Sequence, residues 1–182
     1  MTAIKIHFGE PGNLSYLRPN WAKAVADIVK EFGGRPFLTD CNTLYVGRRK
    51  DALEHIESAY ENGFTPFSTG CQVIIADGLK GTDETYVPVE GGELVQEAKI
   101  GTAIMDADVF ISLNHFKGHE ATGFGGALKI LEWAAVPVPE KPSSTAAENH
   151  ISRNVSAAVA DAARRNVPTA AWSSMKQPEK CT

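Results

Sequence analysis

The sequence has no long apolar run, no closely spaced cysteines and no strong excess of one charge. No apolar stretch approaches the roughly 18 residues that a membrane-spanning helix needs, and the N-terminal residues MTAIKIHFGE lack the apolar segment of a signal peptide. The three cysteines form no C-x-x-C pair, which argues against a disulfide framework. The net charge is −4 without a basic stripe, so neither nucleic acid nor an anionic membrane is an expected partner. We therefore expect a soluble cytoplasmic protein.

Glycine is absent from one part of the chain. All 16 glycines lie at or before Gly126, and Ala-Ala pairs such as Ala134-Ala135 and Ala162-Ala163 recur after it. This compositional break near Lys129 predicts a folded domain over residues 1–133 and a divergent tail over residues 134–182. A length of 182 residues is ample for one such domain.

The first part alternates between strand-like and helix-like segments, which predicts an α/β fold: a layered, mostly parallel sheet with helices on its faces. The expected strands are 3–8 (AIKIHF), 35–40 (RPFLTD), 72–76 (QVIIA) and 109–113 (VFISL), the last two of them buried. A β-hairpin insertion is expected around Gly91-Gly92, with a short helix over 101–106.

Three longer helices are expected from apolar periodicity. One starts at Pro19 and ends at Gly33, one covers 49–61, and one runs from Phe124 to about Trp133. His55 is expected on the surface. The residues expected to face inward are Trp21, Val25, Ile28, Val29 and Phe32 on the first helix, and Leu53, Ile56 and Tyr60 on the second.

Polar loops follow three of the expected strands. Ligands of α/β sheets bind beyond the carboxyl ends of the strands, and the loops after parallel neighbours meet at one edge. We therefore expect residues 7–18, 39–43 and 114–126 to form one site for a small-molecule or phosphate-bearing ligand. The candidate residues are His7, Glu10, Arg18, Asp40, Asn42, His115, Lys117, His119, Gly123, Gly125, Gly126 and Lys129.

Each signal also has a plainer interpretation. Gly123, Gly125 and Gly126 would open a helix whose free N–H groups suit an anion, but GFGG is neither a dinucleotide fingerprint nor a P-loop, and glycine also permits close packing. His115 and His119 are four residues apart with a glycine between them, so no metal site is assigned. Cys41 and Cys71 fit small buried residues.

The motifs IKIHFGEPGN, GGRPFLTDCNTLY and HFKGHEATGFGGALK resemble the domain-of-unknown-function family 362, from about Ile4 to Lys129. The resemblance implies a following ferredoxin-type segment with 4Fe-4S clusters in full-length members, and hence a redox partner. The stretch His119 to Lys129 is also similar to a motif of the nickel-pincer lactate racemases, in which the histidine is catalytic and the lysine carries a nucleotide cofactor. This second similarity implies His119 and Lys129 as catalytic residues and Arg18 as a ligand contact.

The sequence departs from the family pattern after Lys129. We interpret the residues from about Ile130 onward as a frameshifted translation, or a truncated tail, in place of a ferredoxin-type segment, because a shifted reading frame can restore glycine and cysteine codons there. A genuine divergent tail, with an Ala-rich helix over 152–165, is the alternative.

Three functions remain open on this basis. The first is a cofactor- or substrate-binding domain of an iron–sulfur redox protein, here without its clusters. The second is an isomerase-like enzyme with a nucleotide cofactor tethered to Lys129 and His119 as general acid and base. The third is a non-catalytic anion- or nucleotide-binding module.

Overall fold

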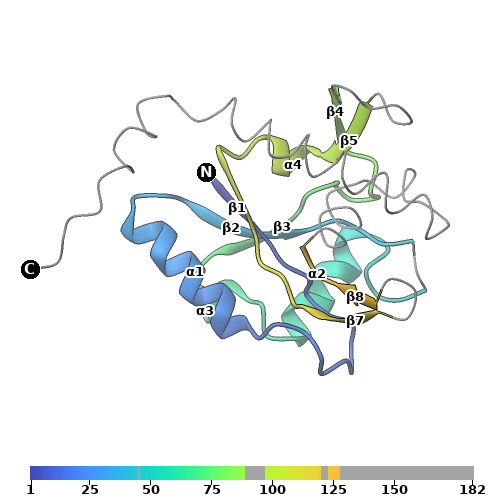
Figure 1. Cartoon of the computed structure of the whole chain (residues 1–182), viewed down its shortest axis with the longest axis horizontal. Helices are drawn as coiled ribbons and strands as arrows, with labels where there is room; N and C mark the ends of the chain where they lie inside the picture. Colours follow the sequence, from blue (N-terminus) through green and yellow to red (C-terminus); the bar gives the residue numbers. More distant parts are fainter. Residues whose placement is uncertain (45, 89–96, 120–122, 128–182) are drawn as a thin grey trace, which may run out of the picture.

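A computed structural model describes residues 1–44, 46–88, 97–119 and 123–127 of the chain; of His119 only the backbone is described. Within these ranges a four-stranded sheet carries the fold (Figure 1). Its strands are β1 (Thr2–Lys5), β2 (Pro36–Asp40), β3 (Gln72–Ile75) and β6 (Val109–Ser112). All neighbours are parallel, in the order β3-β2-β1-β6. The predicted parallel α/β fold is confirmed.

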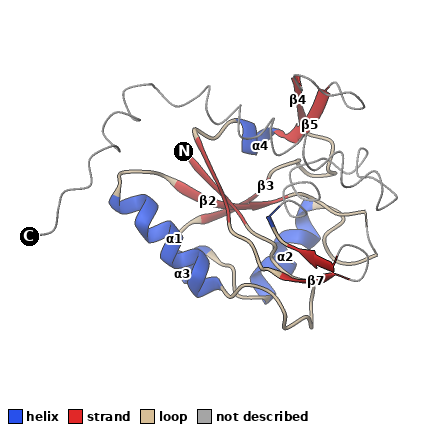
Figure 2. Ribbon diagram, viewed as in Figure 1, coloured by secondary structure: helices blue, strands red, loops and turns tan. Residues whose placement is uncertain are grey.

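Helices and a hairpin connect these strands. The helices are α1 (Pro19–Glu31), α2 (Ala52–Glu61), α3 (Pro66–Thr69) and α4 (Thr102–Met105). The antiparallel pair β4 (Glu84–Pro88) and β5 (Glu97–Gly101) confirms the predicted hairpin insertion, and α4 confirms the predicted short helix. A second antiparallel pair consists of β7 (Lys117–His119) and β8 (Gly123–Gly125). Figure 2 shows the helices on both sides of the sheet.

The two faces of the sheet have separate cores. On one face Ile4 and Leu38 pack with Ala22 of α1 and Ala59 of α2. On the other face Ala3 and its neighbours pack toward β6, and a further cluster joins β5 to α4. Because both faces of β1 and β2 are covered, every side chain of β1 is buried, including the charged Lys5.

The faces of the two long helices agree with the expectation only in part, because Val25, Val29 and Ile56 pack against the core but other expected residues do not. On α1, Ala22 and Ala26 are buried, whereas Trp21, Ile28 and Phe32 are mostly exposed. On α2, His55, Ser58 and Ala59 are buried, whereas Leu53 and Tyr60 are mainly exposed. Because the buried residues are small, each helix axis lies close to the sheet. His55 and Ser58 can be buried because each side chain has a polar partner inside the protein. The expected surface position of His55 is therefore wrong.

Three other expectations need correction. The strands β3 and β6 lie at the two edges of the sheet, so Ile74 and Val109 are exposed rather than buried on both faces. The helix expected to begin at Phe124 does not begin there, because Gly123–Gly125 pair with Lys117–His119 as a strand. No helix within the described ranges is long and apolar enough to cross a membrane.

Candidate functional site

The carboxyl ends of the parallel strands form one polar edge. The loop that starts at His7 follows β1, residues 41–43 follow β2, Asp77 lies just after β3, and residues 113–116 follow β6. The N–H of Leu113 donates to the carbonyl of Lys5 at 2.8 Å, so the loops after β1 and β6 leave the sheet side by side. The sequence-based expectation that these loops share an edge is correct.

Glu10 fastens the loop after β1 to the segment before α2. Its carboxylate accepts hydrogen bonds from the Arg48 N–H at 3.1 Å and from Arg49 Nε at 2.6 Å. A Cβ at Gly47 would lie only 2.9 Å from Glu10 Oε1, so a side chain there would displace the carboxylate. Burial opposes ionisation, but the hydrogen bond and charge of Arg49 lower the pKa of Glu10 below its usual value.

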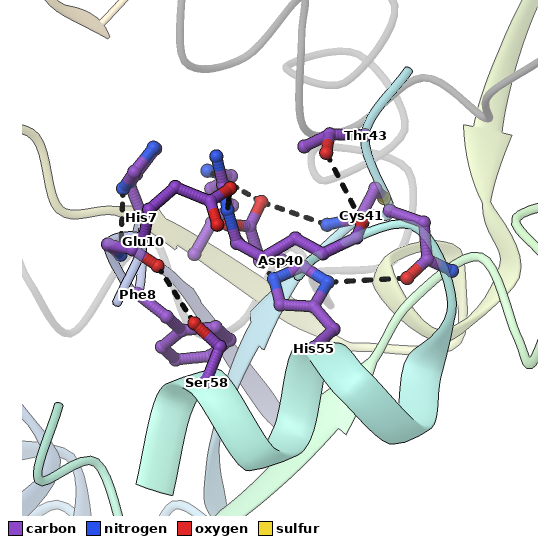
Figure 3. A network of polar contacts seen from close by, with 12 residues as sticks. His7, Phe8, Glu10, Asp40, Cys41, Thr43, His55 and Ser58 are labelled. Atoms are coloured by element: carbon purple, nitrogen blue, oxygen red, sulfur yellow. Dashed lines mark hydrogen bonds and ion pairs between the residues drawn. The ribbon is translucent and has the colours of Figure 1, made fainter. Parts of the chain in front are cut away.

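Asp40 lies at the centre of the same network, at the end of β2 (Figure 3). It accepts a hydrogen bond from the N–H of Cys41 at 2.9 Å. Lys5 Nζ lies 3.2 Å from one of its oxygens, and Arg49 Nη1 lies 3.5 Å from the other. Burial would raise the pKa of Asp40, but the charge of Lys5 and the close contact with His55 outweigh it, so the pKa falls well below its usual value. Asp40 is therefore an ionised carboxylate inside the protein.

Asn42 connects the ends of β2 and β3. Its backbone N–H and its Nδ2 both donate to the carboxylate of Asp77 at 3.0 Å, and Nδ2 also donates to the carbonyl of Gly78. Its Oδ1 lies 3.3 Å from Nδ1 of His55. Asn42 is fully buried, so its donors and its acceptor are used within the protein.

His7 presents a neutral imidazole at the end of β1. Its Nδ1 accepts the N–H of Gly9 at 2.9 Å, so in the neutral ring the proton is on Nε2. Burial, followed by the positive charge of Arg49, lowers the pKa of His7 to about 4. At neutral pH its Nε2–H can therefore donate a hydrogen bond to a ligand, and no described residue accepts one from it.

Hydrogen bonds from α2 and its C-terminal end hold the loop that carries His7. Ser58 Oγ donates to the carbonyl of Gly9 at 3.3 Å, and Asn62 Nδ2 donates to the carbonyl of Phe8 at 2.9 Å. A Cβ at Gly9, where φ is +83°, would come within 2.9 Å of both Tyr16 and Asn62. The loop thus has one closely fitted conformation.

The expected site residues divide into four groups. His7, Glu10, Asp40 and Asn42 meet in the network. Arg18 lies apart from it, since its guanidinium donates to the carbonyl of Leu14 and lies over the ring of Tyr16. His115 and Lys117 follow β6 at the same edge, with no hydrogen bond to the network among the described residues. The remaining residues are His119, Gly123, Gly125 and Gly126 on or beside the β7–β8 hairpin, and Lys129, which is outside the described residues.

The correction at β8 removes the structural basis of the expected helix-terminus site. Gly123 and Gly125 belong to a strand rather than a first helical turn, so they do not present a row of helix N–H groups to an anion. Their contact with a ligand stays a prediction, as do the catalytic roles of His119 and Lys129. No group of three or more metal-ligating side chains is found in the described part of the chain.

Sequence analysis missed four members of the network: Lys5, Arg49, His55 and Asp77. Lys5 could be found only once β1 is known to be a central parallel strand, in which a lysine has no solvent-facing side to reach. Asp77 had a usable signal, since it directly follows the expected strand 72–76. Arg49 and His55 had none, because each becomes part of the network only through the orientation of α2 and the segment before it.

Comparisons with known proteins support the family resemblance. The sequence pattern of the family described as Domain of unknown function (DUF362) matches residues 2–173. Over 115 residues the chain is 29% identical to the thylakoid-associated protein sll1697 of Synechocystis, a match that covers 60% of this chain and 30% of that protein. The chain thus spans about a third of the length of the curated relative. No solved structure matches. Because the family pattern extends over most of the sequence, the chain belongs to the Domain of unknown function (DUF362) family.

Proposed function

We propose that this chain is the ligand-binding α/β domain of an iron–sulfur-linked redox protein, with its ligand at the carboxyl edge of β1 and β6. The observation that carries the proposal is the order of the strands. The chain runs from β1 outward to β2 and β3, and then returns to place β6 on the other side of β1. Ligands of open α/β sheets bind at such a reversal.

The residues at this reversal suit a small polar ligand. His7, at the end of β1, offers a neutral Nε2–H donor. His115 and Lys117, which follow β6, add a second imidazole and a surface cation. Lys117 would attract a carboxylate or phosphate group, and His7 would donate to an oxygen of the same ligand. We propose that the ligand binds between the loops after β1 and β6, near the buried Asp40.

The redox part of the proposal rests on the family resemblance. Cys41 and Cys71 are buried in separate parts of the domain, and no disulfide joins them. An iron–sulfur cluster needs four closely grouped ligands, usually cysteines. The clusters would accordingly belong to a ferredoxin-type segment beyond this domain, and the ligand bound here would be the group that exchanges electrons with them.

Calorimetric titration with inorganic phosphate, ADP and NAD tests the ligand site. We expect at least one of the three to bind, and Lys117→Ala to weaken that binding by roughly tenfold, as expected for loss of about 1.4 kcal/mol from a charge-assisted contact. His7→Gln should weaken it by a similar factor. Arg35→Ala is the matched control, because Arg35 is an exposed cation at the opposite edge, just before β2.

Two outcomes of the titration would count against this proposal. Binding that Arg35→Ala weakens as much as Lys117→Ala would place the ligand elsewhere or make the attraction non-specific. Absence of binding to all three compounds would count against a phosphate-bearing ligand and leave this proposal without its substrate class.

A further inference from the structure

Three ionisable side chains meet beneath the candidate site with almost no access to solvent. They are Lys5 on β1, Asp40 at the end of β2 and His55 on α2, each with a side chain at most 1% exposed. Lys5 Nζ lies 3.2 Å from Asp40 Oδ1, and His55 Nε2 lies 3.6 Å from Asp40 Oδ2. One buried carboxylate therefore faces two groups that can each carry a proton.

Asn42 determines which nitrogen of His55 is protonated when the ring is neutral. The amide nitrogen of Asn42 is committed as a donor to Asp77 and to the Gly78 carbonyl. Its oxygen must then be the atom that faces His55 Nδ1, since the reverse orientation would set that oxygen against two acceptors. Nδ1 thus carries the proton, and a neutral His55 turns a bare Nε2 toward Asp40.

This arrangement leaves a proton position unfilled. Within the described residues, His55 Nε2 and Lys5 Nζ are buried without a hydrogen bond of good geometry, although both are within ion-pair distance of Asp40. A bare Nε2 opposite a carboxylate oxygen places two acceptors together. Protonation of Nε2 would relieve that contact by turning His55 into an imidazolium.

Asp40 is the carboxylate that Lys5 and His55 both face within ion-pair distance. Arg49 is permanently charged, and Glu10 neutralises it at 2.6 Å. Asp40 can neutralise one further cation, which is either Lys5 or His55. His7 is neutral above about pH 4. The buried carboxylate of Asp77 is one amide removed, because Asn42 donates to it and also faces Nδ1 of His55. A second cation would have to share the counter-charge of Asp40, which is unfavourable inside a protein.

We propose that Lys5 and His55 compete for a single proton beside Asp40, which makes this centre a buried proton-binding site that regulates the adjoining ligand site. At neutral pH the proton stays on Lys5, because an amine is more basic than an imidazole. Burial lowers the pKa of Lys5 and of His55, and in both cases Asp40 opposes that decrease.

Acidification would add a second proton, at His55, and therefore one positive charge beside Asp40. The added charge would repel Arg49. Arg49 would move away from Asp40 rather than from Glu10, because it lies 3.5 Å from Asp40 but only 2.6 Å from Glu10. Since Glu10 belongs to the loop that carries His7, the repulsion would shift that loop and weaken ligand binding. This regulatory role rests on the proposed function, whereas the competition for one proton does not.

Nitrogen-15 NMR of the histidine rings tests the competition directly. In the wild-type protein at pH 7 we expect His55 to be neutral with its proton on Nδ1. In Lys5→Met the freed carboxylate should draw a proton onto Nε2, making His55 an imidazolium at pH 7, with its proton affinity raised at least about tenfold, or one pKa unit. Lys23→Met is the matched control, because Lys23 is half exposed and pairs only with Asp27 among the described residues.

Two results would overturn the proposal. One is a His55 ring whose protonation is the same in Lys5→Met as in the wild type. The other needs no variant: a wild-type His55 protonated on Nε2 at pH 7 contradicts the competition even if Lys5→Met does not fold. Neither of these NMR measurements requires a bound ligand. A shift of His55 without any ligand binding would therefore reject the proposed function and support the proton site, and ligand binding without the shift would do the reverse.

Discussion

His7 is a histidine that the fold keeps uncharged. It lies in the loop after the central strand β1, accepts the N–H of Gly9 and lies near the positive charge of Arg49. Burial and that charge together lower its pKa to about 4, while an unfolded chain would give a value near 6.5. A neutral imidazole at this position is a hydrogen-bond donor that does not depend on pH over the physiological range.

The same pKa decrease lowers the stability of the folded protein at mildly acidic pH. The unfolded chain binds a proton at this residue below about pH 6.5, and the folded protein binds it only below about pH 4. Stability is therefore complete above pH 6.5 and falls between these values, by up to about 3 kcal/mol. Urea unfolding of His7→Gln should show a smaller decrease between pH 7 and pH 4 than the wild type. An equal decrease in both proteins would show that His7 titrates normally.

Residue-level prediction found the correct edge of the sheet where a side chain ends or directly follows a strand. Asp40 and Asn42 could be assigned to this edge because the carboxyl ends of parallel strands meet there, and their contact with a ligand stays a prediction. Lys5 could not be assigned without knowing that β1 is central, and Arg49 could not be assigned without the loop that folds back onto Glu10. Periodicity gives the phase of a strand, but it does not identify which charged groups meet inside the protein.

Helix orientation shows the same limit at the scale of the element. The apolar residues of α1 predicted its length and its start at Pro19, yet Ala22 and Ala26 face the sheet. Alanine permits a close approach between helix and strand, which a large residue at the same position prevents. On α2 the buried face includes His55 and Ser58, because each finds a polar partner. Hydrophobicity alone assigned both faces only in part, since Val25, Val29 and Ile56 do pack against the core.

A pair of substitutions on α1 tests this orientation. Ala26→Leu adds bulk where Ala26 is fully buried, and we expect a loss of about 1–3 kcal/mol of unfolding free energy. Ile28→Ala removes bulk from a side chain that is 53% exposed, and we expect a loss below about 1 kcal/mol. Urea denaturation of both variants provides the comparison. A larger loss for Ile28→Ala than for Ala26→Leu would mean that the apolar face of α1 is the buried one.

At the scale of the whole molecule, the alternation of strands and helices was sufficient to predict the parallel sheet. It was not sufficient to predict the order β3-β2-β1-β6, because sequence order does not show where the chain reverses. The expectation that VFISL is buried on both faces failed for that reason, since β6 is an edge strand among the described residues. The helix expected after Phe124 failed because glycine-rich sequences fit a tight hairpin as well as a helix start.

The family pattern matches as far as residue 173. Our interpretation of the sequence predicts a shifted reading frame earlier, directly after Lys129. Sequencing the gene across this junction tests the interpretation directly. We expect a shifted frame after the codon for Lys129 to restore glycine codons and the closely spaced cysteine codons of a ferredoxin-type segment. The frame-corrected protein, reconstituted with iron and sulfide, should then show the broad visible absorbance of a 4Fe-4S cluster, and the present chain, treated identically, should not. One uninterrupted frame without such cysteine codons would instead mean that the tail is genuine, and the ligand site at β1 and β6 would have to work with a redox centre supplied by another protein.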